Sequence, residues 1–226
     1  MKYVGALLAG ILAGIVLFVL LVYFNPLIKA RTVSPIAVTD SRQFELVYTA
    51  TPDDSILWAD NGEVNARLRP PMVAKLVEPA INETKLLVTM LRNSRGKSVG
   101  VGIKFETVAE ETGVLNGIYP VNSTWHMWLL DRGGMLIDQK ENQWSLLRDV
   151  VLPAHIGSGD SWQGSWYGIL TNGPQSLGTA AVSGGSGSLA GAVGAAIESI
   201  SARAYSTIRG PVAMEGRITV SLADDR

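Results

Sequence analysis

The chain has 226 residues, of which 47% are hydrophobic, and 19 basic against 20 acidic side chains give a formal net charge of −1. A chain of this length can bury a sizeable core, and its balanced charge offers no basic surface for nucleic acid. Because the sequence contains no cysteine, it excludes disulfides, thiol chemistry and lipoprotein attachment.

An uncharged apolar segment occupies residues 4–24, after a short N-terminal tail at residues 1–3. About 21 helical residues, at about 1.5 Å each, match a hydrocarbon core about 30 Å thick. A cleaved signal peptide, with cleavage after Ala30, is the alternative, but its apolar region is normally shorter. The segment therefore predicts an uncleaved signal anchor and a single-pass membrane protein.

The orientation of this anchor does not follow from its flanking charges. Lys2 lies on one side, and Lys29 and Arg31 lie close on the other, so the bias in basic residues is negligible. The bulk of the chain follows the anchor, and this layout favours a periplasmic or otherwise extracytoplasmic domain.

Small residues recur every four positions within the anchor, at Ala6, Gly10 and Gly14. They form one stripe on a helix, and such stripes let two membrane helices approach closely. The stripe predicts helix–helix contact, either in a homodimer or with other subunits of a membrane complex. The alternative is that these small residues face the lipid and make no contact with another helix.

After a Pro-containing juxtamembrane tether at residues 25–40, residues 41–226 read as one β domain. Short runs with period-two alternation are separated by Gly, Asn, Asp and Pro, which predicts an all-β fold, an antiparallel barrel or closed sheet of about 8–10 strands. Hairpin turns are expected at 93–97 and 132–134, and residues 61–83 predict an extended loop with a short helix near 72–78. The expected strands are 43–50, 85–92, 99–108, 124–131, 135–139, 161–170, 177–182, 193–200 and 216–223.

The glycine-rich segment SGGSGSLAGAVGAAIES, residues 183–199, has three interpretations: a linker, a second membrane helix or a corner of the β domain. Its polar content opposes a membrane helix. The 27 residues that follow Ser199 are too few for a second domain. The segment therefore predicts an ordered corner, in which glycine is required by the turn geometry. The glycines concerned are Gly184, Gly185, Gly187 and Gly191.

Residues 182–194, VSGGSGSLAGAVG, resemble the G-G-[ST]-G-x-[FY]-x-G-x-x-G corner of the allene oxide cyclase and dirigent-like barrels. In that superfamily the corner joins two late strands of an eight-stranded antiparallel barrel, and the resemblance implies the same fold here. Leu189 stands where an aromatic residue is usual, and no second signature of the family is present. No catalytic position is carried over.

No metal or cofactor site is expected. The chain has only two histidines, His126 and His155, 29 residues apart, and zinc sites need three or four ligands at closer spacing. Phosphate-binding loops and the G-x-S-x-G nucleophile elbow are also absent from the sequence.

The segment TWHMW at 124–128 is the richest local group of functional side chains. Strand alternation places His126 and Trp128 on one face, and Trp125 and Met127 on the other. If the first pair faces the barrel interior, it forms an aromatic wall beside a titratable group, suited to a small apolar ligand. A solvent-facing His126 is the alternative.

Trp162 and Trp166 share a strand face and are expected either to line the same cavity or to pack in the core. Three functions are then compatible with the sequence. The least demanding is a membrane-anchored, non-catalytic domain of the cell envelope that binds a small apolar ligand or a partner protein. The second is an accessory subunit of a membrane complex, recognised through its anchor. The third is a cyclase- or isomerase-type enzyme, which an inward His126 near a carboxylate would indicate.

Overall fold

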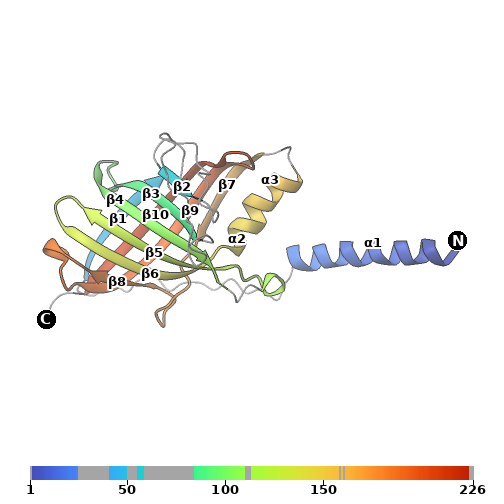
Figure 1. The fold of residues 1–226 in the computed structure, drawn as a ribbon, viewed down its shortest axis with the longest axis horizontal. Helices are drawn as coiled ribbons and strands as arrows, with labels where there is room; N and C mark the ends of the chain where they lie inside the picture. Colours follow the sequence, from blue (N-terminus) through green and yellow to red (C-terminus); the bar gives the residue numbers. More distant parts are fainter. Residues whose placement is uncertain are drawn as a thin grey trace.

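The computed structural model describes residues 2–24, 41–49, 55–58, 84–109, 113–157, 159 and 161–223. Figure 1 shows a twisted β-barrel with a short helical segment at one end and a separate N-terminal helix. The expected tether at 25–40, the loop at 61–83 and the helix near 72–78 lie outside the described residues.

Ten strands form the β domain, in agreement with the predicted all-β fold. Most overlap the predicted runs, but β2 was not predicted, β5 and β10 begin four and six residues earlier than expected, and β8 begins three residues later. Both predicted hairpin turns are confirmed: Gly96 adopts positive φ between β3 and β4, and Gly133 adopts positive φ at the start of β6. The strands are β1 (Ser41–Thr49), β2 (Ser55–Trp58), β3 (Thr84–Arg92), β4 (Ser98–Val108), β5 (Pro120–Leu129), β6 (Gly133–Asn142), β7 (Ser161–Ile169), β8 (Ala180–Gly184), β9 (Val193–Ser206) and β10 (Gly210–Ala223).

The barrel is closed and antiparallel. Neighbouring strands follow the order β1-β10-β9-β8-β6-β5-β4-β3, and the pairing of Val47 with Arg92 joins β3 back to β1. Of the remaining strands, β2 pairs with β3, and β7 pairs with the second half of β9. The predicted closed barrel is therefore confirmed, with eight strands in its wall.

The N-terminal helix α1 (Lys2–Tyr23) lies outside the barrel. Its stretch Tyr3–Leu21 is long and apolar enough to cross a membrane. The last turn of α1 lies near η1 (Val114–Asn116), a single helical turn between β4 and β5. Figure 1 shows this end of α1 beside the barrel end where β4 finishes and β5 begins.

A helical segment between β6 and β7 was not predicted from the sequence. It consists of α2 (Trp144–Leu146), the π-helical turn η2 (Leu147–Val151) and α3 (Leu152–Ile156). Val150 of η2 is fully buried against Leu170 and the inward side chains of β9 and β10. The segment therefore covers one side of the barrel end that faces α1 (Figure 1).

Alternation along the strands separates a packed lumen from the outer wall. On β5 every second side chain from Val121 to Leu129 is buried. At the end away from α1 the lumen is apolar, filled by side chains such as Met127, Met135 and Val220. A second, smaller apolar cluster lies under the helical segment.

The glycine-rich segment forms a turn between two strands of the barrel. It runs from β8 through the turn η3 (Gly187–Leu189) into β9, and the side chain of Leu189 is buried. Gly187 and Gly191 have φ of 64° and 74°. Gly185 does not adopt positive φ. Its amide instead donates a hydrogen bond to the Gly134 carbonyl at 2.9 Å, which ties the corner to β6.

We expect Gly187→Ala to destabilise the domain and Gly185→Ala to have little effect. A β-carbon at 187 would lie 2.5 Å from the Arg132 carbonyl oxygen, whereas one at 185 would have an ordinary contact at 3.6 Å. The left-handed conformation alone costs a non-glycine residue about 1–2 kcal/mol. Thermal denaturation of the two variants measures the difference, and equal melting temperatures would contradict this account of the corner.

Candidate functional site in the barrel lumen

A cluster of ionisable side chains lies inside the barrel, between the two apolar clusters. Along the inward face of β9, Ala196 of the first cluster is followed by Glu198 and then by Ile200 of the second. Glu198 therefore marks a polar layer across the lumen. The same layer receives Lys104 from β4, and Gln139 and Glu141 from β6.

Lys104 is the centre of this layer. Its Nζ lies 2.8 Å from a carboxylate oxygen of Glu106, 2.7 Å from one of Glu141 and 3.0 Å from one of Glu198. The side chains of Lys104, Glu141 and Glu198 are at most 2% exposed, whereas that of Glu106 is 19% exposed. Glu106 thus connects the layer to the barrel end that faces α1.

Neutral side chains donate hydrogen bonds to the same carboxylates. Trp125 Nε1 donates to Glu198 at 3.1 Å, and Tyr48 donates to the other oxygen of Glu198. Gln139 Nε2 donates to Glu141 at 2.9 Å and also to Glu198. Ser123 donates to Glu141. The result is one connected network that spans the lumen, in which every carboxylate has several partners.

Two glycines make room for the aromatic members of the network. A β-carbon at Gly216 would lie 2.0 Å from the Tyr48 ring, and one at Gly102 would lie 2.9 Å from the Trp125 ring. The rings of Tyr48 and Trp125 meet edge to face, with centroids 4.9 Å apart. Glycine at these two positions lets both rings reach across the lumen to Glu198.

The network shifts the acid–base properties of its members. Burial by itself would lower the pKa of Lys104, but the three carboxylates raise it well above its usual value. Burial raises the pKa of Glu141 to about 7; the nearby Glu198 and Glu106 add to the effect, and the Lys104 ammonium opposes it. Burial would also raise the pKa of Glu106, but the Lys104 ammonium lowers it overall. Lys104 therefore stays charged, and Glu141 exchanges its proton near neutral pH.

The sequence-predicted ligand residues do not line this lumen. Trp125 and Met127 point inward, whereas His126 is exposed and Trp128 is 58% exposed on the outer wall. Of the two orientations that strand alternation left open, the structure has the one with a solvent-facing His126. On the outer wall, His126 and Trp128 border a mostly apolar groove of about 320 Å³ between β4 and β6.

Trp162 and Trp166 are half-buried and pack against the second apolar cluster, so the structure places them in the core. Each ring lies over a glycine of β7, Trp162 over Gly164 and Trp166 over Gly168. In α1, Ala6, Gly10 and Gly14 are exposed, and helix–helix contact through this stripe stays a prediction.

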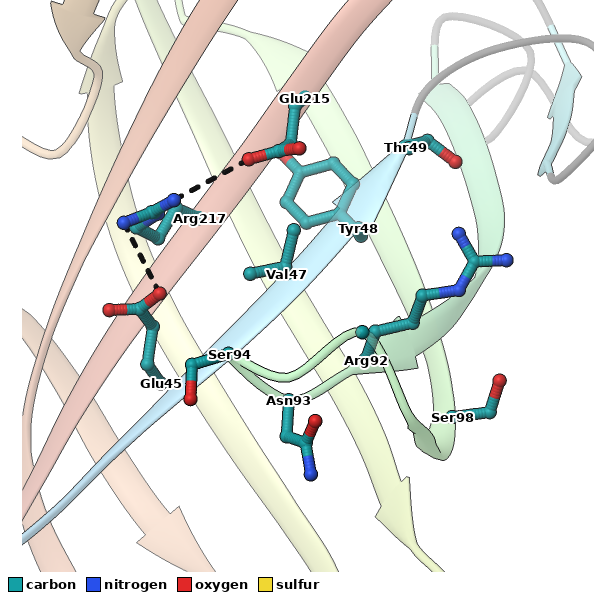
Figure 2. A pocket seen from close by; sticks show the side chains of 11 residues that line it. Glu45, Val47, Tyr48, Thr49, Arg92, Asn93, Ser94, Ser98, Glu215 and Arg217 are labelled. Atoms are coloured by element: carbon teal, nitrogen blue, oxygen red, sulfur yellow. Dashed lines mark ion pairs between the residues drawn. The ribbon is translucent and has the colours of Figure 1, made fainter.

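A further hollow of about 610 Å³ lies on the outer wall where β1 meets β3. Figure 2 shows Arg217 between Glu45 and Glu215, at 3.3 and 3.5 Å. These charges are largely solvated and pair within the hollow, and such surface pairs contribute little energy. Among the described residues, no group of His, Cys, Asp or Glu is arranged to hold a metal ion.

No protein-family model and no curated protein matches the chain. A similar solved structure is described as a nonspecific heme-binding cyclase that catalyses a 4 + 2 cycloaddition during neoabyssomicin biosynthesis. The two share 10% sequence identity with a TM-score of 0.41, over 83% of this chain and 66% of that chain. A similarity at this level does not carry an activity from one protein to the other.

We expect Lys104→Met to destabilise the domain strongly. Removing the ammonium leaves three carboxyl groups within a closed lumen, and breaking a buried ion pair from one side costs about 3–5 kcal/mol. Lys140→Met, at an exposed position of β6, is the matched control and should be nearly neutral. Denaturant unfolding of the full chain in one detergent compares the two, and similar midpoints would show that the network contributes little.

Glu141 should also make stability depend on pH. Its pKa is raised from 4.5 to about 7 in the folded protein, so the folded state binds the proton more tightly than the unfolded state. The resulting stabilisation is full below about pH 4.5 and is lost as pH rises through about 7, with an upper limit of about 3 kcal/mol.

This pH effect is measured by unfolding the wild type and Glu141→Gln between pH 5 and pH 8, a range chosen to bracket a pKa of about 7. The wild type should lose stability relative to the variant as pH rises. A constant difference across the range would contradict the raised pKa. Glu106 has a lowered pKa, so its effect on the pH dependence of stability has the opposite sign. That effect appears only at more acidic pH, and it is present in both the wild type and Glu141→Gln.

Proposed function

We propose that the protein is a membrane-anchored barrel enzyme that transfers protons to and from a small molecule, a reaction of the isomerase or cyclase type. The observation that supports this most directly is the buried group of Lys104 with Glu106, Glu141 and Glu198. Burying three ionisable groups beside a fourth that is partly exposed is expensive, and strongly perturbed groups of this kind concentrate at functional sites.

The roles follow from the geometry. Glu141, with a pKa of about 7, donates a proton to one atom of the substrate and takes one back from another, so that the net reaction is a rearrangement without redox change. The Lys104 ammonium stabilises negative charge that develops on the substrate. Glu198 is held in place by Tyr48 and Trp125 and positions Lys104.

Two further observations are consistent with a substrate in this region. Glu106 connects the network to the barrel end near α1. The buried indole N–H of Trp144 has no hydrogen-bond partner within the described part of the chain. Its neighbour Gln143 donates to Glu141 at 2.8 Å. Buried donors are nearly always paired, and an acceptor atom of a substrate would satisfy this one.

The barrel is compatible with the resemblance to the allene oxide cyclase and dirigent-like superfamily, and we propose that family relationship on the corner at 182–194. We also propose that α1 is an uncleaved anchor and that the barrel is extracytoplasmic.

A second candidate function is the non-catalytic binding of a small apolar ligand. It is supported by the outer groove, which Val101, Ile103, Trp128 and Leu136 line with apolar surface. Exposed apolar patches of this kind often mark binding sites. Accessory-subunit function through the α1 stripe has no comparable structural support.

Proton transfer can be tested without knowing the substrate. We expect wild-type protein in nanodiscs, incubated in heavy water with a lipid and small-molecule extract, to introduce deuterium into at least one compound. Glu141→Gln should introduce none, because it removes the group that exchanges the proton. Untargeted mass spectrometry of the extract compares the two, with the Lys140→Met protein as an active control.

The same experiment distinguishes the two candidate functions. A compound that the wild type retains without deuterium uptake, and that Trp128→Ala releases, would support apolar ligand binding in the outer groove instead. Identical deuterium patterns for the wild type and Glu141→Gln would contradict the proposed enzymatic function.

A further inference from the structure

The barrel end near α1 carries several exposed aliphatic side chains. They occur on three separate turns: the η1 loop, the end of α3, and the turn between β9 and β10. Exposed apolar side chains that gather on one surface often mark a contact with a membrane or a protein. The exposed fractions are 48% for Leu115, 39% for Ile118, 82% for Ile156 and 66% for Ile208; we call these four residues the apolar rim.

The anchor helix ends beside this rim. The last turn of α1 lies near η1. Its final residue Tyr23 and the following Phe24 are exposed aromatics with ring centroids 5.2 Å apart. Aromatic residues at the end of a membrane helix sit at the membrane–water interface. Figure 1 shows α3 and the η1 loop extending toward α1 as far as the point where α1 ends. These two parts of the rim and the aromatic end of α1 therefore lie at about the same level.

The polar side chains beside the rim suit a lipid surface. Arg209 follows Ile208, and the imidazole of His155 precedes Ile156; both side chains are exposed. Arg148 also lies at this end and pairs with Asp149 at 2.6 Å; the hydrogen bond to Asp149, with a smaller contribution from Tyr23 of α1, raises the pKa of its guanidinium. Aliphatic side chains with basic neighbours are typical of segments that enter the headgroup region of anionic membranes.

We propose that the apolar rim docks the barrel onto the surface of the bilayer that holds α1, with Leu115, Ile118, Ile156 and Ile208 inserted among the headgroups. Docking covers the exposed aliphatic surface and fixes the orientation of the barrel relative to α1. Glu106, the partly exposed member of the lumenal network, then faces the lipid. If the proposed function is correct, on which this last step rests, the substrate is a lipid-soluble molecule that enters from the bilayer.

The absence of cysteine from the sequence makes site-specific labelling straightforward. Leu115→Cys and Ile156→Cys place a fluorescent label on the rim, and Ser94→Cys places one in the exposed β3–β4 turn at the opposite end of the barrel. The full chain is reconstituted in nanodiscs of phosphatidylcholine mixed with phosphatidylglycerol, with part of the lipid carrying a nitroxide quencher in its headgroup.

We expect the labels at 115 and 156 to be quenched several-fold more strongly than the label at 94. Equal quenching at all three positions would overturn the docking proposal. Labels at 115 and 156 that are shielded from water but not quenched by lipid would also overturn it, and would indicate a protein partner on the rim. The readout is independent of catalysis, so the same quenching pattern in a Glu141→Gln background separates failure of docking from failure of the proposed function.

Discussion

The arrangement of the barrel interior depends on one ammonium group. Lys104 extends from β4 across the lumen and contacts carboxylates on β6 and β9, strands that are not its neighbours in the sheet. Moving each charge out of water costs several kcal/mol, which only close mutual contact and additional hydrogen bonds offset. The positions of Tyr48, Trp125 and Gln139 follow from this requirement, because each donates a hydrogen bond to Glu198.

A polar layer of this kind is a poor way to stabilise a small barrel. Aliphatic side chains of similar volume would fill the same space without a desolvation cost. The chain instead places apolar clusters on both sides of the layer and uses Gly102 and Gly216 to admit two aromatic rings. Local arrangements that cost stability are most common where a protein carries out its function, and the lumenal network is therefore the best-supported candidate site.

Much of the fold could be predicted from the sequence, and the site could not. Alternation located most of the strands, and turn residues located both hairpins. In TWHMW, however, both faces carry a tryptophan, so alternation alone did not show that Trp125 and Met127 face inward. Glu141 and Glu198 occur in phase with apolar inward residues, which was the available signal, but charged residues on a strand are normally assigned to solvent. On β4 the apolar residues Val101 and Ile103 are in the opposite phase to Lys104, so alternation there pointed Lys104 to solvent. The segment 144–156 is short and contains Pro153, which obscured its helical spacing.

The position of β1 has a consequence for how the barrel forms. It is the first strand of the barrel in the chain, yet its pairing partner along its whole length is the last strand, from Ser41 with Ala223 to Thr49 with Glu215. The cylinder therefore cannot close until the final strand has been synthesised. Contacts between such distant parts of a chain form slowly, because a large loop must first be ordered. During that interval β1 lacks its main partner strand and is exposed to pairing with a wrong one.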